Sequence, residues 1–200
     1  IIKITPYPNT TTFKNLKENG YASINFVDNV YLFTLASLKD PNSSIGLKKF
    51  PAELYGSYEL MLGRISKEGF KKLKDRENVS FPYVNEAWAI SFCEVIEENH
   101  INRENSLGKL ILSEFKLRSH SLVKKRESFK LFNRAENLII ESLILATRLK
   151  LAREINDEVL FSTIHNKLTD HLQNIERFSK NECANKSLKL LKQYISKLMI

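Results

Sequence analysis

This chain of 200 residues has few of the residue types on which metal centres and disulfide frameworks depend. Its two cysteines, Cys93 and Cys183, lie far apart and have no Cys or His neighbours at the spacing of metal ligands. The four histidines form no ligand motif either. The sequence therefore predicts two reduced cysteines and no metal site.

Glycine is also scarce, with six residues in the chain. No Gly-rich phosphate loop of the dinucleotide or nucleoside-triphosphate type occurs. No nucleophile–base arrangement and no pair of carboxylates stands out. Any chemistry that this chain performs would therefore depend mainly on a bound cofactor.

Long apolar runs are missing as well. No stretch approaches the length that crosses a bilayer, and no signal peptide opens the chain, so a cytoplasmic protein is expected. Hydrophobic residues make up 42% of the chain and charged residues 27%, which is ordinary for a globular protein. The length allows one large domain or two small ones.

What the chain does have is positive charge, with a formal net charge of +8 at pH 7. Ten Lys and Arg residues and three Glu residues lie between Lys116 and Arg153, so this segment alone carries +7. Such a segment could attract nucleic acid, meet an anionic cofactor or substrate, or form a solvated surface. Few aromatic residues are interspersed with the basic ones, which disfavours a nucleic-acid binder.

The most informative segment is a run of three threonines at residues 10–12. It lies between a predicted strand at residues 1–5 and a predicted short helix at residues 13–20, which Gly20 ends. Unpaired backbone N–H groups and the positive end of the helix dipole favour an anion here, such as the phosphate of a ligand. Alternatively, one threonine caps the helix, which is the commoner role of Thr before a helix.

Two segments far apart in the chain carry motifs that occur together elsewhere. The first combines residues 10–16 (TTTFKNL) with residues 24–30 (INFVDNV). The second combines residues 132–136 (FNRAE) with residues 140–141 (IE) and 146–149 (ATRL). In this order they resemble an archaeal flavoprotein family known mainly as a domain of unknown function. Many members of that family have Arg in the middle of the threonine triplet, where this chain has another Thr.

This resemblance implies an α+β fold, in which a flavin-binding split β-barrel is followed by a C-terminal helical subdomain. Flavin reductases and the pyridoxamine-phosphate oxidase group share this barrel. The change from strand to helix near Phe132 assigns residues 1–131 to the barrel and residues 132–200 to a three-helix subdomain. Because the chain has no initiator Met and residues 1–4 resemble an internal barrel strand, two further N-terminal strands are expected to be missing from this sequence.

The resemblance also implies FMN as the cofactor, with candidate contacts in the first motif. Thr10, Thr12 and Asn15 are expected to contact the phosphate and the ribityl chain. Thr11 would contribute a backbone N–H. Split-barrel flavoproteins generally complete the flavin site across a two-fold axis, so a homodimer is expected.

Further candidates lie outside the threonine turn. Asn25 would lie at the edge of the flavin ring or order a turn. Asn133 and Arg134 would help to build the cofactor pocket or the dimer interface. Alternatively, Arg134 belongs with Glu141 and Arg148 to a polar stripe at a spacing of seven residues, which pairs with neighbouring helices.

The remaining elements are predicted from hydrophobic periodicity, and Glu136 is expected to lie outside the apolar face of its helix. Strands are predicted at residues 20–33 (interrupted at 28–29), 87–97 and 109–123. Side chains of the strand at 87–97 alternate between its two faces, and the strand at 109–123 is expected to be its antiparallel partner. A polar turn is predicted at 99–106, a partial helix at 57–74, and helices from 133, at 156–178 and from about 185.

The predicted function is an FMN-binding flavoprotein, with an NAD(P)H-linked flavin reductase-like oxidoreductase as the leading activity. One alternative is a non-enzymatic flavin-binding protein, and another is a nucleic-acid binder that uses the basic segment. The sequence identifies no catalytic residue.

Overall fold

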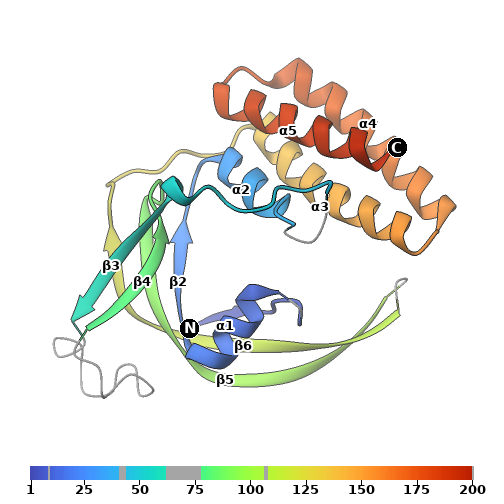
Figure 1. Ribbon diagram of the computed structural model, residues 1–200. Coiled ribbons are helices and arrows are strands. Elements are labelled where there is room, and N and C mark those ends of the chain that lie inside the picture. The colour runs from blue at the N-terminus through green and yellow to red at the C-terminus, as the bar shows by residue number, and fades with distance from the viewer. Residues whose placement is uncertain (9, 41–43, 62–77, 106–107, 200) are drawn as a thin grey trace. The chain divides into compact units, whose positions relative to one another are not determined.

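The computed structural model describes residues 1–8, 10–40, 44–61, 78–105 and 108–199 (Figure 1). Its fold is mixed α+β, as predicted, with antiparallel sheets and α-helices. The chain forms two compact units, which we call the sheet unit and the helical unit. The sheet unit comprises Ile1–Phe26 and Glu53–Ser128, and the helical unit comprises Val27–Ala52 and Phe129–Ile200.

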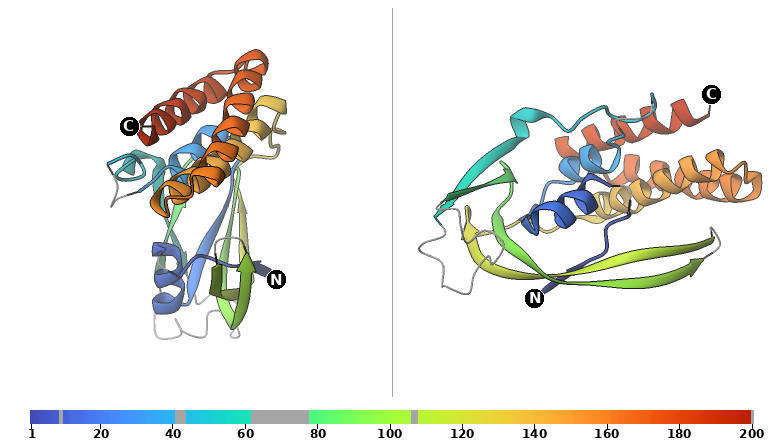
Figure 2. Two further views of the ribbon diagram at one scale, coloured as in Figure 1. Left: turned by 90° about the vertical axis from the view of Figure 1, so that its right-hand side faces the viewer. Right: turned by 60° about the horizontal axis from the view of Figure 1, so that its bottom comes forward.

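The main sheet of the sheet unit has the strand order β1–β6–β5–β2, and each neighbouring pair is antiparallel. Its strands are β1 (Ile2–Ile4), β2 (Tyr21–Phe26), β5 (Ala89–Asn105) and β6 (Gly108–Lys124). The β5–β6 hairpin, which the sequence predicted as an antiparallel pair, is strongly curved (Figure 2). Its register shifts twice along β5, and such irregularities bend a strand and increase its twist.

A second sheet pairs β3 (Tyr55–Met61) with β4 (Asn78–Val84), and a short 3-10 helix at Ala52–Leu54 precedes it. Among the described residues the strands form these two sheets and no closed barrel.

Helix α1 (Thr11–Asn19) covers one face of the main sheet. It ends at Gly20, as predicted, and Gly20 has the left-handed conformation. Its Leu16 packs with Cys93 of β5 and Phe115 of β6. Phe92, on the other face of β5, is also fully buried. The predicted alternation of β5 is therefore correct, but both of its faces are covered.

The described residues of the helical unit form four α-helices, and each begins at a side-chain cap from Asn or Asp. They are α2 (Val30–Ser37), α3 (Arg134–Glu154), α4 (Glu158–Phe178) and α5 (Glu182–Leu198). Leucine and isoleucine side chains from α3, α4 and α5 form its core, together with residues of α2. The three C-terminal helices lie within a few residues of their predicted positions.

The strand predicted over residues 20–33 is wrong beyond Phe26, because residues 30–37 form α2. An unbroken apolar run such as this one has no periodicity that separates a strand from a buried helix. The Asn29 side chain accepts a hydrogen bond from the Tyr31 N–H and starts the helix.

Two other predictions also differ from the structure. The partial helix predicted over 57–74 is wrong up to residue 61, because this part of the chain is the strand β3; residues 62–74 lie outside the described residues. The turn predicted over 99–106 is wrong up to Asn105, since β5 continues through it as a paired strand. No helix in the described ranges combines the length and the apolar character needed to cross a membrane.

Candidate functional site

The threonine run lies at the start of α1, as predicted, and its first member is the helix cap. Thr10 has extended backbone angles, and its hydroxyl accepts a hydrogen bond from the Phe13 N–H at 3.2 Å. The same hydroxyl donates to the Tyr7 carbonyl at 2.7 Å. The Thr10 hydroxyl is therefore engaged in helix capping.

Thr11 and Thr12 occupy the first two positions of α1, and both are exposed. Neither hydroxyl has a hydrogen-bond partner among the described residues. The first turn of α1 contains no acidic residue, whereas α3, α4 and α5 each have a glutamate there. The positive end of the α1 dipole is therefore not neutralised by a side chain of its own helix, which favours an external anion.

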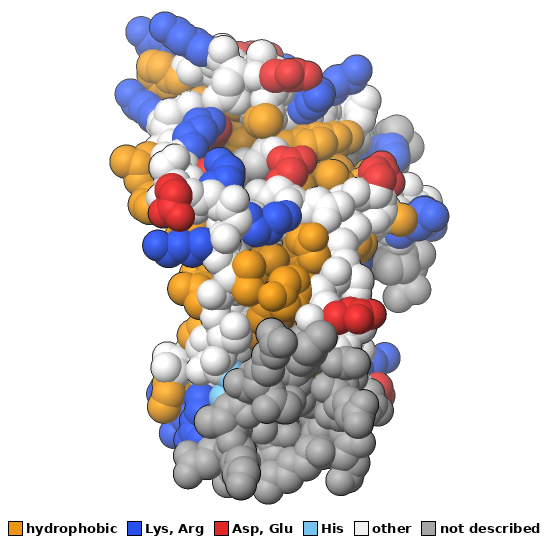
Figure 3. Space-filling model, turned by 90° about the vertical axis from the view of Figure 1, so that its left-hand side faces the viewer, with side chains coloured by type: hydrophobic (Ala, Val, Ile, Leu, Met, Phe, Trp, Pro, Cys, Tyr) orange, Lys and Arg blue, Asp and Glu red, His pale blue; other side chains and the backbone are white. Residues whose placement is uncertain are grey.

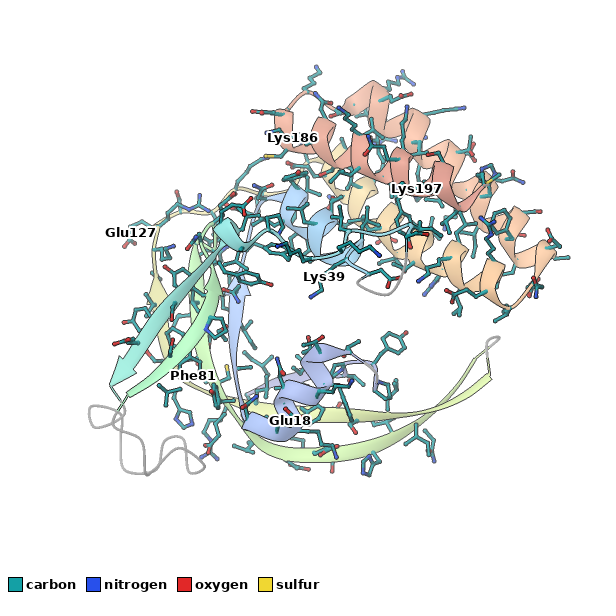
Figure 4. The ribbon with its side chains drawn as sticks, in the orientation of Figure 1. Glu18, Lys39, Phe81, Glu127, Lys186 and Lys197 are labelled. Atoms are coloured by element: carbon teal, nitrogen blue, oxygen red, sulfur yellow. The ribbon has the colours of Figure 1, made fainter. Side chains whose placement is uncertain are left out.

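Beside this first turn the sheet unit has a pocket of about 300 Å³. One wall is a single face of α1, because residues 12, 15, 16 and 19 recur at helical spacing. The remaining walls come from β1, β2 and β4, and Phe81 of β4 is labelled in Figure 4. The lining residues are Ile4, Thr12, Asn15, Leu16, Asn19, Tyr21, Ala22, Ser23, Ile24, Phe81 and Pro82.

The wall from β2 and β4 is mainly apolar. Ser23 donates a hydrogen bond to the Pro82 carbonyl, which ties β2 to β4. The Tyr21 and Phe81 rings meet edge to face with centroids 4.9 Å apart, and Phe81 in turn contacts Phe92. The pocket thus combines hydroxyl and amide groups from α1 with an aromatic and aliphatic wall.

Of the predicted site residues, the structure brings Thr12 and Asn15 together in this pocket. The sequence analysis missed Asn19 and the whole wall from β4. Asn19 could have been found, since it follows Asn15 by four residues on the same helix face. Phe81 could not, because it reaches β2 only through the contact of the second sheet with that strand, which is made by side chains of β2.

Asn25 lies in β2 and joins it to β4. Its side-chain oxygen accepts a hydrogen bond from the Val84 N–H at 2.8 Å, and its amide donates to the Ser23 carbonyl. These bonds account for Asn25 as a connection between the two sheets.

Asn133 and Glu136 form a capping box at the start of α3. The Asn133 side chain accepts from the Glu136 N–H, and the Glu136 carboxylate accepts from the Asn133 N–H at 2.9 Å. Glu136 also forms an ion pair with Lys130 at 2.5 Å and accepts from the Asn181 amide at 3.2 Å. The prediction that Glu136 lies outside the packed face is wrong, because it is fully buried with these partners.

Arg134 is exposed and stacks on the Phe178 ring of α4, with its guanidinium carbon 4.2 Å from the ring centroid. Glu141 and Arg148 are also exposed, and neither has an ion-pair partner among the described residues. The i,i+7 spacing separates these charges by two helical turns, about 10 Å, so they do not pair with one another.

A buried polar pair in the sheet unit was not predicted. The Glu94 carboxylate of β5 lies 3.3 Å from His120 Nε2 of β6, and both side chains are more than nine-tenths buried. Each residue lies within a strand pattern that gave no sign of the pair, because only the register of the hairpin brings them together.

The basic segment is divided between the two units at Ser128. Three of its lysines, Lys116, Lys130 and Lys150, pair with acidic side chains. On the face in Figure 3, Lys and Arg side chains are interspersed with acidic and apolar ones. The net charge of this segment is therefore not evidence of one continuous basic surface.

No group of His, Cys, Asp and Glu in the described ranges could hold a metal ion. Both cysteines are free thiols, and burial raises the pKa of the Cys93 thiol.

Comparisons with known proteins add a family and a fold. The sequence profile of the N-terminal domain of DUF447, a protein family of unknown function, matches residues 2–107. The crystal structure of an FMN-bound protein from Methanosarcina mazei, which carries the same family assignment, matches with a TM-score of 0.60 and 16% identity. The match covers 96% of this chain and 80% of that one. None of the curated proteins matches this chain.

Proposed function

This chain belongs to the DUF447 family of proteins of unknown function, and we propose that it binds FMN in the pocket of its sheet unit. The observation that carries the proposal is the two-sided chemistry of this pocket, polar along α1 and apolar along β2 and β4. FMN combines a flat aromatic ring system with a phosphate on a hydroxylated chain, so it needs both kinds of contact. The FMN held by the Methanosarcina mazei protein of similar fold supports this choice of ligand.

The phosphate belongs at the first turn of α1. Thr11 would donate its backbone N–H, Thr12 its hydroxyl, and Asn15 its amide to the phosphate or the ribityl chain. The absence of an acidic side chain from this turn supports an anionic ligand. Thr10 supports the site indirectly, because its hydroxyl holds the turn in a helical conformation.

The apolar wall suits the flavin ring. A volume of about 300 Å³ lies at the lower end of the range of small-molecule sites, roughly 300–1,000 Å³, so the pocket would enclose part of FMN. Aliphatic and aromatic side chains would exclude water from the part of the flavin ring that lies inside the pocket. When bound, FMN supplies redox chemistry that the side chains of this chain do not.

For the activity, we favour an NAD(P)H-linked flavin reductase-like oxidoreductase, with a non-enzymatic flavin-binding protein as the alternative. The motifs at residues 10–16 and 132–136 support the first, through their likeness to a split-barrel flavoprotein family. The same likeness supports a split barrel and a homodimer as the assembled form.

FMN binding is tested by titration of the purified chain with FMN, riboflavin and FAD. We expect FMN to bind more tightly than riboflavin by at least about tenfold, since a phosphate at α1 adds charge-assisted hydrogen bonds. Equal affinity for FMN and riboflavin would mean that α1 does not bind the phosphate. If no flavin binds, the proposal is wrong.

The two activities are separated by rapid mixing of the FMN-loaded protein with NADH or NADPH. Loss of flavin absorbance within the time of a catalytic turnover, followed by its return in air, supports the reductase. A flavin spectrum that neither nucleotide changes supports the non-enzymatic alternative.

A further inference from the structure

The face of α1 that lines the pocket carries three polar side chains in a row. Thr12, Asn15 and Asn19 are three and four residues apart, so they lie one above another along the helix. Each is exposed, and within the described residues none of these side chains has a hydrogen-bond partner. Ser23, by contrast, already donates to the Pro82 carbonyl. One helix face therefore has three polar side chains available to one ligand.

The two ends of this row have different surroundings. Thr12 lies in the first turn of α1, near the positive end of the helix dipole, whereas Asn19 is the last residue of the helix. Asn19 follows Thr12 by seven residues, which is about 10 Å along the helix axis. Tyr21 lies only two residues after Asn19, and its ring meets the Phe81 ring in the pocket wall. The row thus runs from the expected phosphate position to the aromatic part of the wall.

The carboxamide of Asn19 is suited to one edge of the flavin ring in particular. An Asn side chain has a hydrogen-bond acceptor and a donor side by side. The pyrimidine part of the flavin ring has an imide edge, at which the N3–H donor lies between two carbonyl acceptors. Asn can pair with such an edge through two hydrogen bonds, as it does with the adjacent donor and acceptor of adenine in DNA. The benzene part of the ring, which carries two methyl groups, has neither a donor nor an acceptor.

We propose that the pyrimidine part of the flavin ring lies at the C-terminal end of α1, where Asn19 pairs with its imide edge. Asn19 Oδ1 accepts from the ring N3–H, and Asn19 Nδ2 donates to a ring carbonyl. This inference rests on the proposed binding of FMN in the pocket, and it adds which part of the ring the chain recognises. The benzene part then extends out of the pocket, in agreement with a volume of about 300 Å³ that encloses only part of FMN.

The test compares FMN with two analogues that each carry one extra methyl group. In the full native chain, N3-methyl-FMN is expected to bind at least about tenfold more weakly than FMN, because it lacks the donor and adds bulk beside Asn19. The matched analogue has ethyl in place of methyl on the benzene ring, and it should bind within about twofold of FMN. Equilibrium dialysis measures the three dissociation constants.

Asn19→Ala tests the side chain itself. This variant is expected to bind FMN about tenfold more weakly than the native chain, while its affinity for N3-methyl-FMN changes by less than about twofold. Asn19→Asp keeps the shape of the side chain but places a second oxygen against the ring carbonyl, so it should bind FMN no better than Asn19→Ala.

The matched control variants lie on the same helix. Asn15→Ala removes a carboxamide that is proposed to contact the phosphate or the ribityl chain, so it should weaken FMN and N3-methyl-FMN by the same factor. Glu18, which is labelled in Figure 4, is exposed and does not line the pocket, so Glu18→Ala should change neither affinity. Circular dichroism checks that every variant is folded.

Three results would overturn this assignment and leave FMN binding in place. Equal native affinity for FMN and N3-methyl-FMN would mean that the imide edge does not contact the protein. Discrimination that Asn19→Ala retains in full would assign this edge to another group of the pocket. Native affinity of Asn19→Asp for FMN would exclude the pairing through two hydrogen bonds. If the native chain binds no flavin at all, the proposed function itself is wrong, and this inference is wrong with it.

Discussion

Helices α1 and α3 both begin with a polar cap, and each cap lies in one of the two motifs that are similar to those of a flavoprotein family. The groups around the two caps differ. At α3, Asn133 and Glu136 satisfy one another, and Lys130 and Asn181 complete the coordination of a buried carboxylate. At α1, Thr10 closes the cap alone, and no acidic residue follows in the first turn.

The difference separates two uses of the same local chemistry. A helix start whose donors already meet a buried carboxylate has little left for a ligand, and its residues contribute to stability. A helix start that is exposed, lacks its own acid and borders a pocket can accept an anion. Substitutions at the start of α3 should therefore change stability, and substitutions of the α1 residues that line the pocket should change binding.

The largest expected effect is on stability, from Glu136→Ala. The variant removes the acceptor of the Asn133 N–H and of the Asn181 amide, and it leaves a cavity inside the helical unit. Loss of a buried hydrogen-bonded carboxylate and one half of a capping box should lower the free energy of unfolding by about 3 kcal/mol. Urea denaturation followed by circular dichroism measures it.

The control is Glu158→Ala, which removes the exposed first-turn glutamate of α4. It should change the free energy of unfolding by less than about 0.5 kcal/mol. If the two variants were equally stable, the buried network at α3 would contribute no more than an ordinary surface charge.

The second effect is on binding, from Thr12→Val. The change removes one hydroxyl donor from the α1 side of the pocket and keeps the shape of the side chain. FMN affinity should fall about tenfold, or about 1.4 kcal/mol, while stability stays the same. Isothermal titration calorimetry measures the dissociation constant.

Thr11→Val is the matched control for binding, because the proposed site uses only the backbone N–H of Thr11. Its FMN affinity should stay within about twofold of the native value. Equal losses in both variants would mean that the site does not distinguish the two hydroxyls, and no loss in either would leave α1 with a capping role alone.

The third effect is smaller and belongs to the cap of α1. Thr10→Ala removes the hydrogen bond to the Phe13 N–H, which should cost about 1 kcal/mol of stability. Thr10→Asn keeps an acceptor at the cap and should restore most of it. Hydrogen exchange of the first-turn amides reports the local change, and protection that is equal in native and Thr10→Ala chains would contradict it.

The sequence predicted what depends on near neighbours. Gly20 ends α1, Thr10 lies before its first turn, and Asn133 begins α3, because caps and stops are local signals. The β5–β6 hairpin followed from alternation of side chains. The position of the threonine run before a helix suggested an anion site, and the family resemblance supplied FMN, which neither spacing nor composition identifies.

What the sequence could not predict depends on contacts across the fold. Glu136 was expected to lie outside the apolar face of its helix, yet it is fully buried. Its partners are Lys130, which precedes it in the chain, and Asn181, which follows it in another helix cap. Phe81 joins the pocket only because the second sheet contacts β2. The helix α2 was mistaken for a strand because burial on all sides removes the polar positions that reveal periodicity.

The smallest expected effect comes from Arg134→Ala, and it decides between the two roles that the sequence allowed for this residue. Arg134 stacks on Phe178 at an exposed site, where such contacts contribute about 0.5–1 kcal/mol to stability. Arg134→Lys keeps the charge but loses the planar stack, so it should recover only part of this loss. If Arg134 acts in packing alone, both variants bind FMN with the native affinity, as measured by the same titration used for Thr12→Val. Alternatively, Arg134→Ala could weaken FMN binding by more free energy than it removes from folding, and Arg134→Lys could restore most of the FMN affinity. That result would mean that the positive charge at the start of α3 contacts the cofactor. In that case the start of α3 would also contribute to binding. Asn133 and Glu136 would still differ from the α1 residues by acting in stability alone, but Arg134 would not.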